Sequence, residues 1–309
     1  ILKGSKFEFE SYPLMFYGTE EIRNAFSIMK LVLEKSGVIF KFNTPVKNVL
    51  PFKSKVLILT SNSWEEFDYA IVATGSFNKL WMERLARTLD VKLGTLGPAG
   101  IGIRLETHNT VLEPLINEFY DFKIYYTATN GYTYRSFCVN RGGSIVNEHR
   151  YRDGLISING RSEQPMTNRS NMAIIAKIPN SKKLVRSIAE GAFQDGGLPR
   201  AFYYQDFVGG SAPKAINLDL GRRNFLLENS REASLLPEQI ETGFVEFLLE
   251  LQKVLPDLAV REDSIVYMPE IKYHMPRWPL EDGFVVSGQP RVQIVGNAAG
   301  YTDSISTAA

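Results

Sequence analysis

Residues 292–300 read Val-Gln-Ile-Val-Gly-Asn-Ala-Ala-Gly, and Tyr-Thr-Asp-Ser-Ile follows at positions 301–305. The β-branched run predicts a strand that meets a turn at Gly296-Asn297, and the small residues after it predict the start of a helix. Such a turn presents unpaired backbone N–H groups to an anionic or polar ligand, and glycine lets the backbone approach it. A tight strand–helix turn without a ligand explains this stretch equally well when it is taken alone.

A second stretch, residues 67–75, favours the ligand interpretation. It reads Phe-Asp-Tyr-Ala-Ile-Val-Ala-Thr-Gly, an apolar β-type run that ends in Ala-Thr-Gly. We interpret Thr74 and Gly75 as one side of a cofactor site whose other side is the turn at Gly296. The alternative is an ordinary strand end.

These two stretches, in this order, resemble flavoproteins with a two-dinucleotide-fold FAD domain. The middle of the chain is similar to one such family, usually called uncharacterised FAD-dependent dehydrogenases. The stretches that carry this similarity are Gly100–Glu106, Arg135-Ser136-Phe137-Cys138, Gly142-Gly143, Ile158–Ser162 and Asn168–Asn171. The resemblance covers nearly the whole chain, and the motifs keep the family's order.

The resemblance implies an α/β fold with two domains and FAD as the cofactor of the full-length protein. A three-layer domain of the FAD/NAD(P)-binding type, incomplete here, would comprise residues 1–97 and 268–309. An inserted α+β, mainly β, substrate domain would comprise residues 98–267. The residues that would face the cofactor are Val46, Thr74, Gly75, Gly296, Asn297, Ala299 and Gly300.

Asn297 departs from the pattern of related flavoproteins, in which the acid of a Gly-Asp pair accepts a hydrogen bond from the ribityl chain of the flavin. An amide oxygen still accepts, but without the carboxylate charge the bond is weaker. The alternative role for Asn297 is a cap on the turn that follows it, and the same applies to Asp303.

The glycine turn that holds a dinucleotide pyrophosphate, G-x-G-x-x-G after a first strand, is missing from the chain. Residues 94–100 come nearest in glycine content, but their spacing is wrong. We therefore expect the chain to be a fragment whose parent carries that unit upstream of Ile1, natural loss of the site being the alternative. Without the pyrophosphate anchor, this chain should bind FAD weakly or not at all.

The composition is typical of a globular protein of one large or two moderate domains, with 309 residues. The balance of 35 basic and 34 acidic side chains argues against a nucleic-acid surface. No apolar run reaches the ~20 residues of a membrane span and no signal peptide is visible, so we expect no membrane partner. The single cysteine excludes an intrachain disulfide and favours a cytoplasmic location.

Hydrophobic periodicity predicts three helices: one from a cap at Thr19 to Gly37, one over Trp81–Leu89, and one from Pro237 to Pro256. The first of them carries Ile22, Phe26, Met29 and Leu33 on one face. The predicted strands are Val38–Phe42, Val46–Leu50, Val56–Thr60, Tyr69–Ala73, Ile101–Glu106, Lys123–Thr127, Tyr132–Val139, Ser144–Val146, Leu155–Ile158, Asn171–Ile178, Gly283–Ser287 and Val292–Val295.

Four arginines in the insert form the main candidate for a substrate pocket, because a guanidinium matches a carboxylate or phosphate with two parallel hydrogen bonds. They are Arg135, Arg141, Arg161 and Arg169, accompanied by Asn159 and Asn171. Solvated side chains are the alternative. From this set and the segment before residue 283, we select Arg135, Asn159, Arg161 and His274 as substrate-binding candidates.

The histidines and the single cysteine are the other candidates for chemistry. His274 is a candidate proton donor beside a flavin, with an ordinary core or surface histidine as the alternative. Cys138 has no second thiol for a disulfide relay and reads as a small buried hydrophobe. The three histidines lack zinc-ligand spacing, so we expect no metal site. No residue qualifies as the catalytic base.

Two hypotheses follow for function. The first is an FAD-dependent oxidoreductase, a dehydrogenase in which a hydride passes from a small-molecule substrate of unknown identity to the flavin, with this chain an inactive fragment of it. The second is a non-catalytic binding or interaction module on a decayed flavoprotein scaffold. The sequence leaves the electron acceptor and the oligomeric state open.

Overall fold

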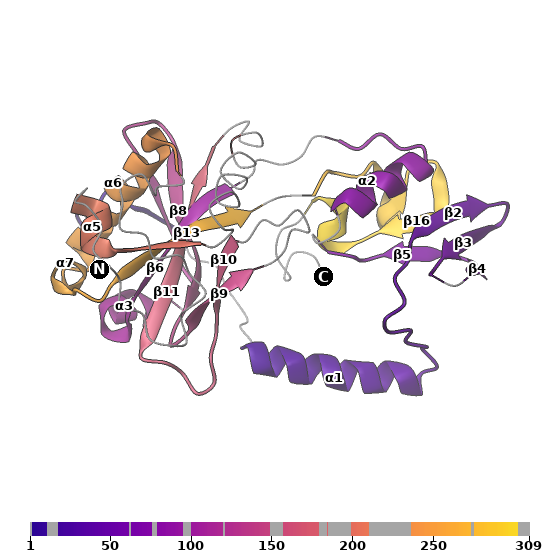
Figure 1. Ribbon diagram of the computed structural model, residues 1–309, viewed down its shortest axis with the longest axis horizontal. Coiled ribbons are helices and arrows are strands. Elements are labelled where there is room, and N and C mark those ends of the chain that lie inside the picture. Colours follow the sequence, from indigo (N-terminus) through magenta and orange to yellow (C-terminus); the bar gives the residue numbers. More distant parts are fainter. Residues whose placement is uncertain are drawn as a thin grey trace. The chain divides into compact units, whose positions relative to one another are not determined.

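The computed structural model describes residues 2–10, 18–61, 63–75, 79–94, 100–119, 121–148, 157–178, 184, 199–209, 236–272 and 275–301. The chain divides into two compact units. The larger unit comprises residues 1–28 and 99–272, and the smaller unit comprises residues 29–98 and 273–309. Together the described residues form a mixed α/β structure (Figure 1).

The boundary predicted after residue 97 lies after residue 98, and the units differ further from the predicted domains at two places, both explained by strand pairing. Residues 1–28 belong to the larger unit because β1 (Glu8–Glu10) pairs antiparallel with β7 (Lys123–Thr127). The second boundary follows residue 272 rather than 267, because β13 (Ile265–Lys272) pairs along its length with β6 (Gly100–His108).

The larger unit is built on a seven-stranded sheet in the order β1-β7-β8-β11-β6-β13-β12. The remaining strands are β8 (Thr133–Asn140), β11 (Arg169–Lys177) and β12 (Arg200–Tyr203), and all neighbours are antiparallel. Separately, β9 (Ser144–Glu148) pairs with β10 (Ser157–Arg161). All predicted strands of this region are confirmed, with ends shifted by no more than three residues.

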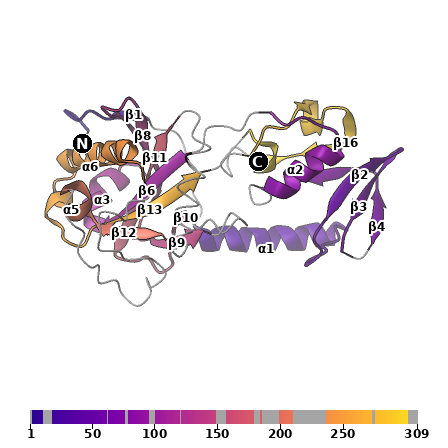
Figure 2. The same ribbon diagram turned by 45° about the horizontal axis from the view of Figure 1, so that its top comes forward.

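The two faces of this sheet have opposite character because side chains alternate along each strand. On β6, Ile101, Ile103 and Leu105 are buried on the apolar face, whereas Arg104 and Glu106 lie on the other, polar face. Helices cover the apolar face: α6 (Glu238–Val254) contacts β8 and β11, and α5 (Tyr204–Gly209) and α3 (Asn109–Ile116) pack beside it (Figure 2). The short α7 (Asp257–Val260) follows α6, which begins and ends as the two prolines predict.

Tyr134 links α6 to the sheet. Its hydroxyl donates to the carbonyl oxygen of Ile240 at 3.0 Å and accepts from Asn130 Nδ2 at 2.8 Å. The ring packs so closely on Gly243 that a Cβ there would lie 2.2 Å from it. Burial of this hydroxyl raises the pKa of Tyr134 to about 12.

This raised pKa predicts a loss of stability at high pH. The folded chain holds the Tyr134 proton more tightly than the unfolded chain, whose tyrosine pKa is about 10. The contribution is therefore complete below about pH 10 and is lost as pH rises from about 10 to about 12. In Tyr134→Phe, the free energy of unfolding should fall less steeply between these pH values than in the original protein, as urea titrations at each pH would measure. A slope unchanged by the substitution would contradict this assignment.

The smaller unit holds two sheets. An antiparallel meander consists of β2 (Asn48–Phe52), β3 (Lys55–Leu59) and β4 (Trp64–Phe67). The second sheet has the order β14-β15-β16-β5. Its strands are β14 (Leu280–Glu281), β15 (Val285–Val286), β16 (Gln289–Ile294) and β5 (Ala70–Val72), with the 3₁₀ turn η3 (Asp282–Phe284) between the first two.

Helix α2 (Lys79–Thr88) supplies one side of the core of the smaller unit. Its residues Met82 and Leu85 are buried against Val292 and Ile294 of β16 and against Trp278, all 0–1 % exposed. This apolar core fixes the position of the sheet edge at which β5 and β16 end.

One predicted strand is wrong. Helix α1 (Thr19–Lys35) begins at the predicted cap and is followed by Gly37 at φ +89°, but residues 38–42 form no strand. None of the described strands pairs with them, and an isolated extended segment leaves its backbone groups to water. Ile39 is 82 % exposed, and the apolar face of α1 is uncovered as well, with Phe26 59 % exposed.

No helix in the described residues is both long and apolar enough to cross a membrane.

Candidate functional site

The two stretches that the sequence singles out lie on neighbouring strands of one sheet. β5 and β16 pair in parallel, with Ala70 opposite Val292 and Val72 opposite Ile294. The backbone N–H of Val295 continues the ladder by donating to the carbonyl oxygen of Val72 at 3.0 Å. Thr74-Gly75 and the turn from Gly296 to Gly300 therefore leave the same edge of the sheet, at the carboxyl ends of adjacent parallel strands. Open α/β sheets bind their ligands at such an edge.

Both strands end in glycines with left-handed backbones. Gly75 and Gly296 each have φ +63°. No described atom lies within 4 Å of the position that a Cβ of Gly75 would take, so a ligand can approach the backbone there. The fit to a dinucleotide cofactor rests on this accessible glycine corner, which we call the β5–β16 corner (Thr74, Gly75 and Gly296–Gly300).

The packing of the smaller unit requires glycine at position 300. Its φ is +80°, and a Cβ would lie 2.4 Å from the carbonyl oxygen of Pro276 and 2.8 Å from the backbone nitrogen of Arg277. Beside it, Trp278 donates its backbone N–H to Ala299 at 3.1 Å. The chain before β14 is thus packed directly against the turn.

The predicted helix start takes a different form in the described residues. Gly296–Ala299 is a single 3₁₀ turn, η4, which closes when the N–H of Gly300 donates to the carbonyl oxygen of Asn297 at 3.2 Å. Asn297 is half-buried within it. The remainder of the predicted helix, with Asp303, lies outside the described residues.

The other two predicted cofactor residues of this unit lie close to its core. Thr74 is half-buried, with its hydroxyl 3.5 Å from the sulfur of Met82. Val46 is 39 % exposed just before β2, where the neighbouring Lys47 carbonyl accepts from the Trp81 indole at 3.0 Å. Both remain predictions as cofactor contacts.

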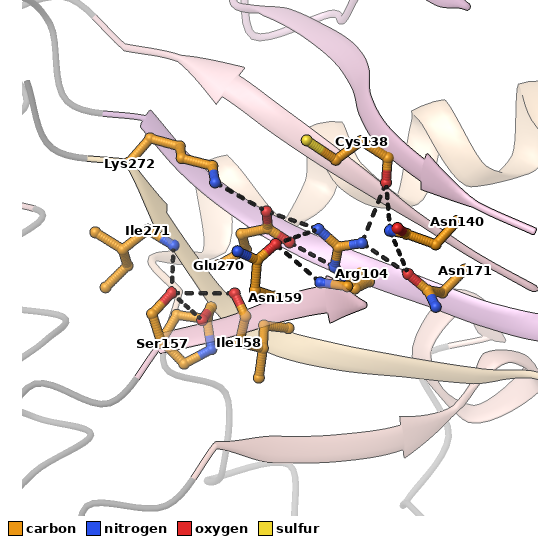
Figure 3. A network of polar contacts seen from close by, with 12 residues as sticks. Arg104, Cys138, Asn140, Ser157, Ile158, Asn159, Asn171, Glu270, Ile271 and Lys272 are labelled. Atoms are coloured by element: carbon orange, nitrogen blue, oxygen red, sulfur yellow. Dashed lines mark hydrogen bonds and ion pairs between the residues drawn. The ribbon is translucent and has the colours of Figure 1, made fainter. Parts of the chain in front are cut away.

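The larger unit contains a buried polar network on the polar face of its sheet (Figure 3). Arg104 on β6 and Glu270 on β13 have completely buried side chains and form a bidentate ion pair at 2.8 and 2.9 Å. The third guanidinium nitrogen of Arg104, Nη1, takes no part in the ion pair. It donates to Asn171 Oδ1 at 2.7 Å and to the carbonyl oxygen of Cys138 at 3.2 Å. Lys272 Nζ lies 3.6 Å from Glu270 Oε1.

The β9–β10 pair closes this network from above the sheet. Asn159 on β10 accepts from Arg104 Nη2 at 3.3 Å and also receives the backbone N–H of Gly160 at 2.8 Å. A Cβ on Gly160 would lie 2.1 Å from Asn140 and 2.2 Å from Arg104. The glycine therefore allows the β10 backbone to rest on the buried guanidinium.

The four predicted arginines do not converge on one pocket. Three of them have separate carboxylate partners: Arg141 with Glu113 at 3.9 Å, Arg161 with Glu163 at 3.6 Å and Arg169 with Asp263 at 2.6 Å. Arg135 is the exception and lies on the polar face of the sheet. Of the substrate-binding candidates, Asn159 contacts Arg104, whereas Arg161 lies at the exposed end of β10, and His274 falls outside the described residues.

Cys138 occupies an irregular position on β8. It is the extra residue of a β-bulge opposite β11 and has φ +46°. Burial raises the pKa of its thiol. His108 caps α3 by accepting the N–H of Thr110, and His149 lies outside the described residues. Among the described residues, no three His, Cys, Asp or Glu side chains gather in a metal-binding group.

Arg104 and Glu270 were not predicted as site residues, although the sequence around each of them carries a signal. Each is a charge with an apolar residue on either side, in Ile103-Arg104-Leu105 and Pro269-Glu270-Ile271. A charge in a strand that is otherwise buried is rarely unpaired, so the two runs could have been matched to each other.

No family model and no curated protein matches the chain. Among solved structures it is similar to CtdE in complex with FAD and a substrate (11 % identity, TM-score 0.36), to a salicylate hydroxylase substrate complex (12 %, 0.39) and to FqzB (10 %, 0.35). These matches cover 89–91 % of this chain and 47–50 % of the other chains, so the chain spans about half the length of the structures it matches.

Proposed function

We propose that the chain is part of an FAD-dependent oxidoreductase and that the β5–β16 corner contacts the cofactor. The supporting observation is the parallel pairing of β5 with β16, which brings Thr74-Gly75 and Gly296-Asn297 to one sheet edge although more than 200 residues separate them. A strand exit without a ligand would not need the two distant motifs to be neighbours.

The residues of the corner would hold the cofactor mainly through their backbone. Gly75 leaves its peptide open to a ligand, and Asn297 offers an amide where related flavoproteins carry an acid. FAD, when bound, would accept a hydride from a small-molecule substrate, while the protein supplies orientation and electrostatics. We assign no residue as a catalytic base.

Replacing Gly75 tests this proposal. In Gly75→Val the branched side chain would fill the open space at the corner, and we expect the dissociation constant for FAD in equilibrium dialysis to rise at least about tenfold, a loss of about 1.4 kcal/mol. The matched control is Gly288→Val in the turn before β16, since Gly288 also has a left-handed backbone (φ +75°) with no described atom within 4 Å of its Cβ position. Equal affinities of the two variants for FAD would contradict the proposed site and favour a non-catalytic module.

A further inference from the structure

Cationic side chains gather around one aromatic ring on the polar face of the larger unit. The ring of Phe137 on β8 has Lys272 Nζ at 4.9 Å, the Arg135 guanidinium at 5.1 Å and Lys123 Nζ at 5.4 Å from its centroid. Positive charges that gather around one ring repel one another, and the aromatic ring offsets only part of that cost.

The carboxylates nearby do not balance these charges. Asp121 pairs with Lys123 at 2.7 Å. Glu270 is shared between Arg104, which holds it with two hydrogen bonds, and Lys272 at 3.6 Å. Among the described residues, Arg104, Lys272 and Arg135 thus have one carboxylate between them, so positive charge is in excess there.

The guanidinium of Arg135 interacts with the side chain of Tyr125, the residue opposite it on β7, but this contact does not use its Nε atom. Its Nε atom is buried and has no hydrogen-bond acceptor among the described residues, and no ion pair to it is formed there. The carboxylate of Glu10 is engaged by the hydroxyl of Tyr125, the residue opposite Arg135 on β7, rather than by the guanidinium. A buried donor without an acceptor is uncommon and indicates a missing partner.

Two irregularities of the sheet produce this arrangement. The bulge at Cys138 changes the register of β8 immediately after Phe137, and a second shift between Tyr267 and Glu270 changes the register of β13 just before Lys272. Bulges of this kind re-aim side chains and are frequent beside binding sites.

From this geometry we propose that the larger unit carries an oxyanion site between Arg135 and Lys272, beside Phe137. The ligand presents a carboxylate or a phosphate group, whose oxygens accept from Arg135 Nε and from the Lys272 ammonium. The guanidinium fork suits either group. The site stands on residues of the larger unit alone and does not require FAD to bind.

The direct test observes the arginine Nε–H signals by ¹⁵N NMR during titration with sodium acetate and, separately, with sodium phosphate, at constant ionic strength. We expect the Arg135 signal, identified by its loss in Arg135→Lys, to shift and saturate with a dissociation constant below about 10 mM. The Arg141 signal, from an exposed arginine paired with Glu113, should not saturate. Saturation by acetate identifies a carboxylate ligand and saturation by phosphate identifies a phosphate ligand, whereas no saturation by either overturns the proposal.

A pair of substitutions separates a built site from general attraction of anions. Both Arg135→Gln and Arg141→Gln remove one positive charge. Followed through the backbone amide of Phe137, Arg135→Gln should weaken anion binding about tenfold and Arg141→Gln should leave it unchanged. Equal weakening in both variants would overturn the proposal. Because FAD takes no part in either measurement, failure here is distinguishable from failure of the proposed cofactor site.

Discussion

Replacement of Glu270 by alanine is expected to destabilise the larger unit by about 3–5 kcal/mol, because it leaves the buried guanidinium of Arg104 without its carboxylate. Both side chains are fully buried, so water cannot replace the lost partner without opening the sheet. Urea unfolding followed by circular dichroism would measure the change. A loss below about 1 kcal/mol would show that the pair is hydrated or dispensable.

Two comparisons make this prediction specific. Glu34→Ala removes the carboxylate of an exposed pair with Lys30, both about 40 % exposed, and should cost no more than about 0.5 kcal/mol. The double variant Arg104→Met, Glu270→Met should be more stable than Glu270→Ala, because it removes the unpaired charge. Recovery will be incomplete, since Asn171 and Asn159 lose a donor with Arg104.

Gly300→Ala is expected to destabilise the smaller unit by about 2–5 kcal/mol. The substitution places a Cβ on a left-handed backbone, which costs about 1–2 kcal/mol. It also forces that Cβ to within 2.4 Å of the Pro276 carbonyl oxygen, a backbone atom that no rotamer change can move. A shift of the peptide at Pro276 would disturb the hydrogen bond from Trp278 to Ala299 and hence the turn itself.

Gly288→Ala isolates the conformational part of this effect. Its φ of +75° is close to that of Gly300, but no described atom lies within 4 Å of its Cβ position, so only the conformational cost of about 1–2 kcal/mol applies. Thermal unfolding of both variants should therefore show a clearly larger fall in Tm for Gly300→Ala. Similar values would mean that the contact with Pro276 is not maintained in solution.

Periodicity predicted most of the elements because their apolar residues recur at the spacing of one strand or helix face, which is a property of the local sequence. Lys123–Thr127 was predicted to the residue, and Thr19 and Pro237 marked the starts of α1 and α6. Val38–Phe42 failed for the opposite reason: its apolar pattern is that of a strand, but a strand forms only when another strand pairs with it. Whether another strand is available for pairing depends on the whole fold and not on the segment itself.

Only part of the candidate site could be predicted from the sequence. The Ala-Thr-Gly and Gly-Asn motifs could be found because backbone geometry there requires glycine. The buried pair of Arg104 and Glu270 lies 166 residues apart in sequence and depends on the register of β6 against β13, which no local pattern specifies. Likewise, the separate carboxylate partners of Arg141, Arg161 and Arg169 could not be predicted, because the order of charges along a chain does not reveal which carboxylate each arginine meets.

The central claim is that the β5–β16 corner binds FAD, and amide chemical-shift mapping during titration with FAD up to about 1 mM tests it most directly, since this range detects even weak binding. We predict saturable shifts concentrated at Thr74, Gly75, Gly296, Asn297 and Ala299. Saturable shifts that are confined to the larger unit would contradict the account.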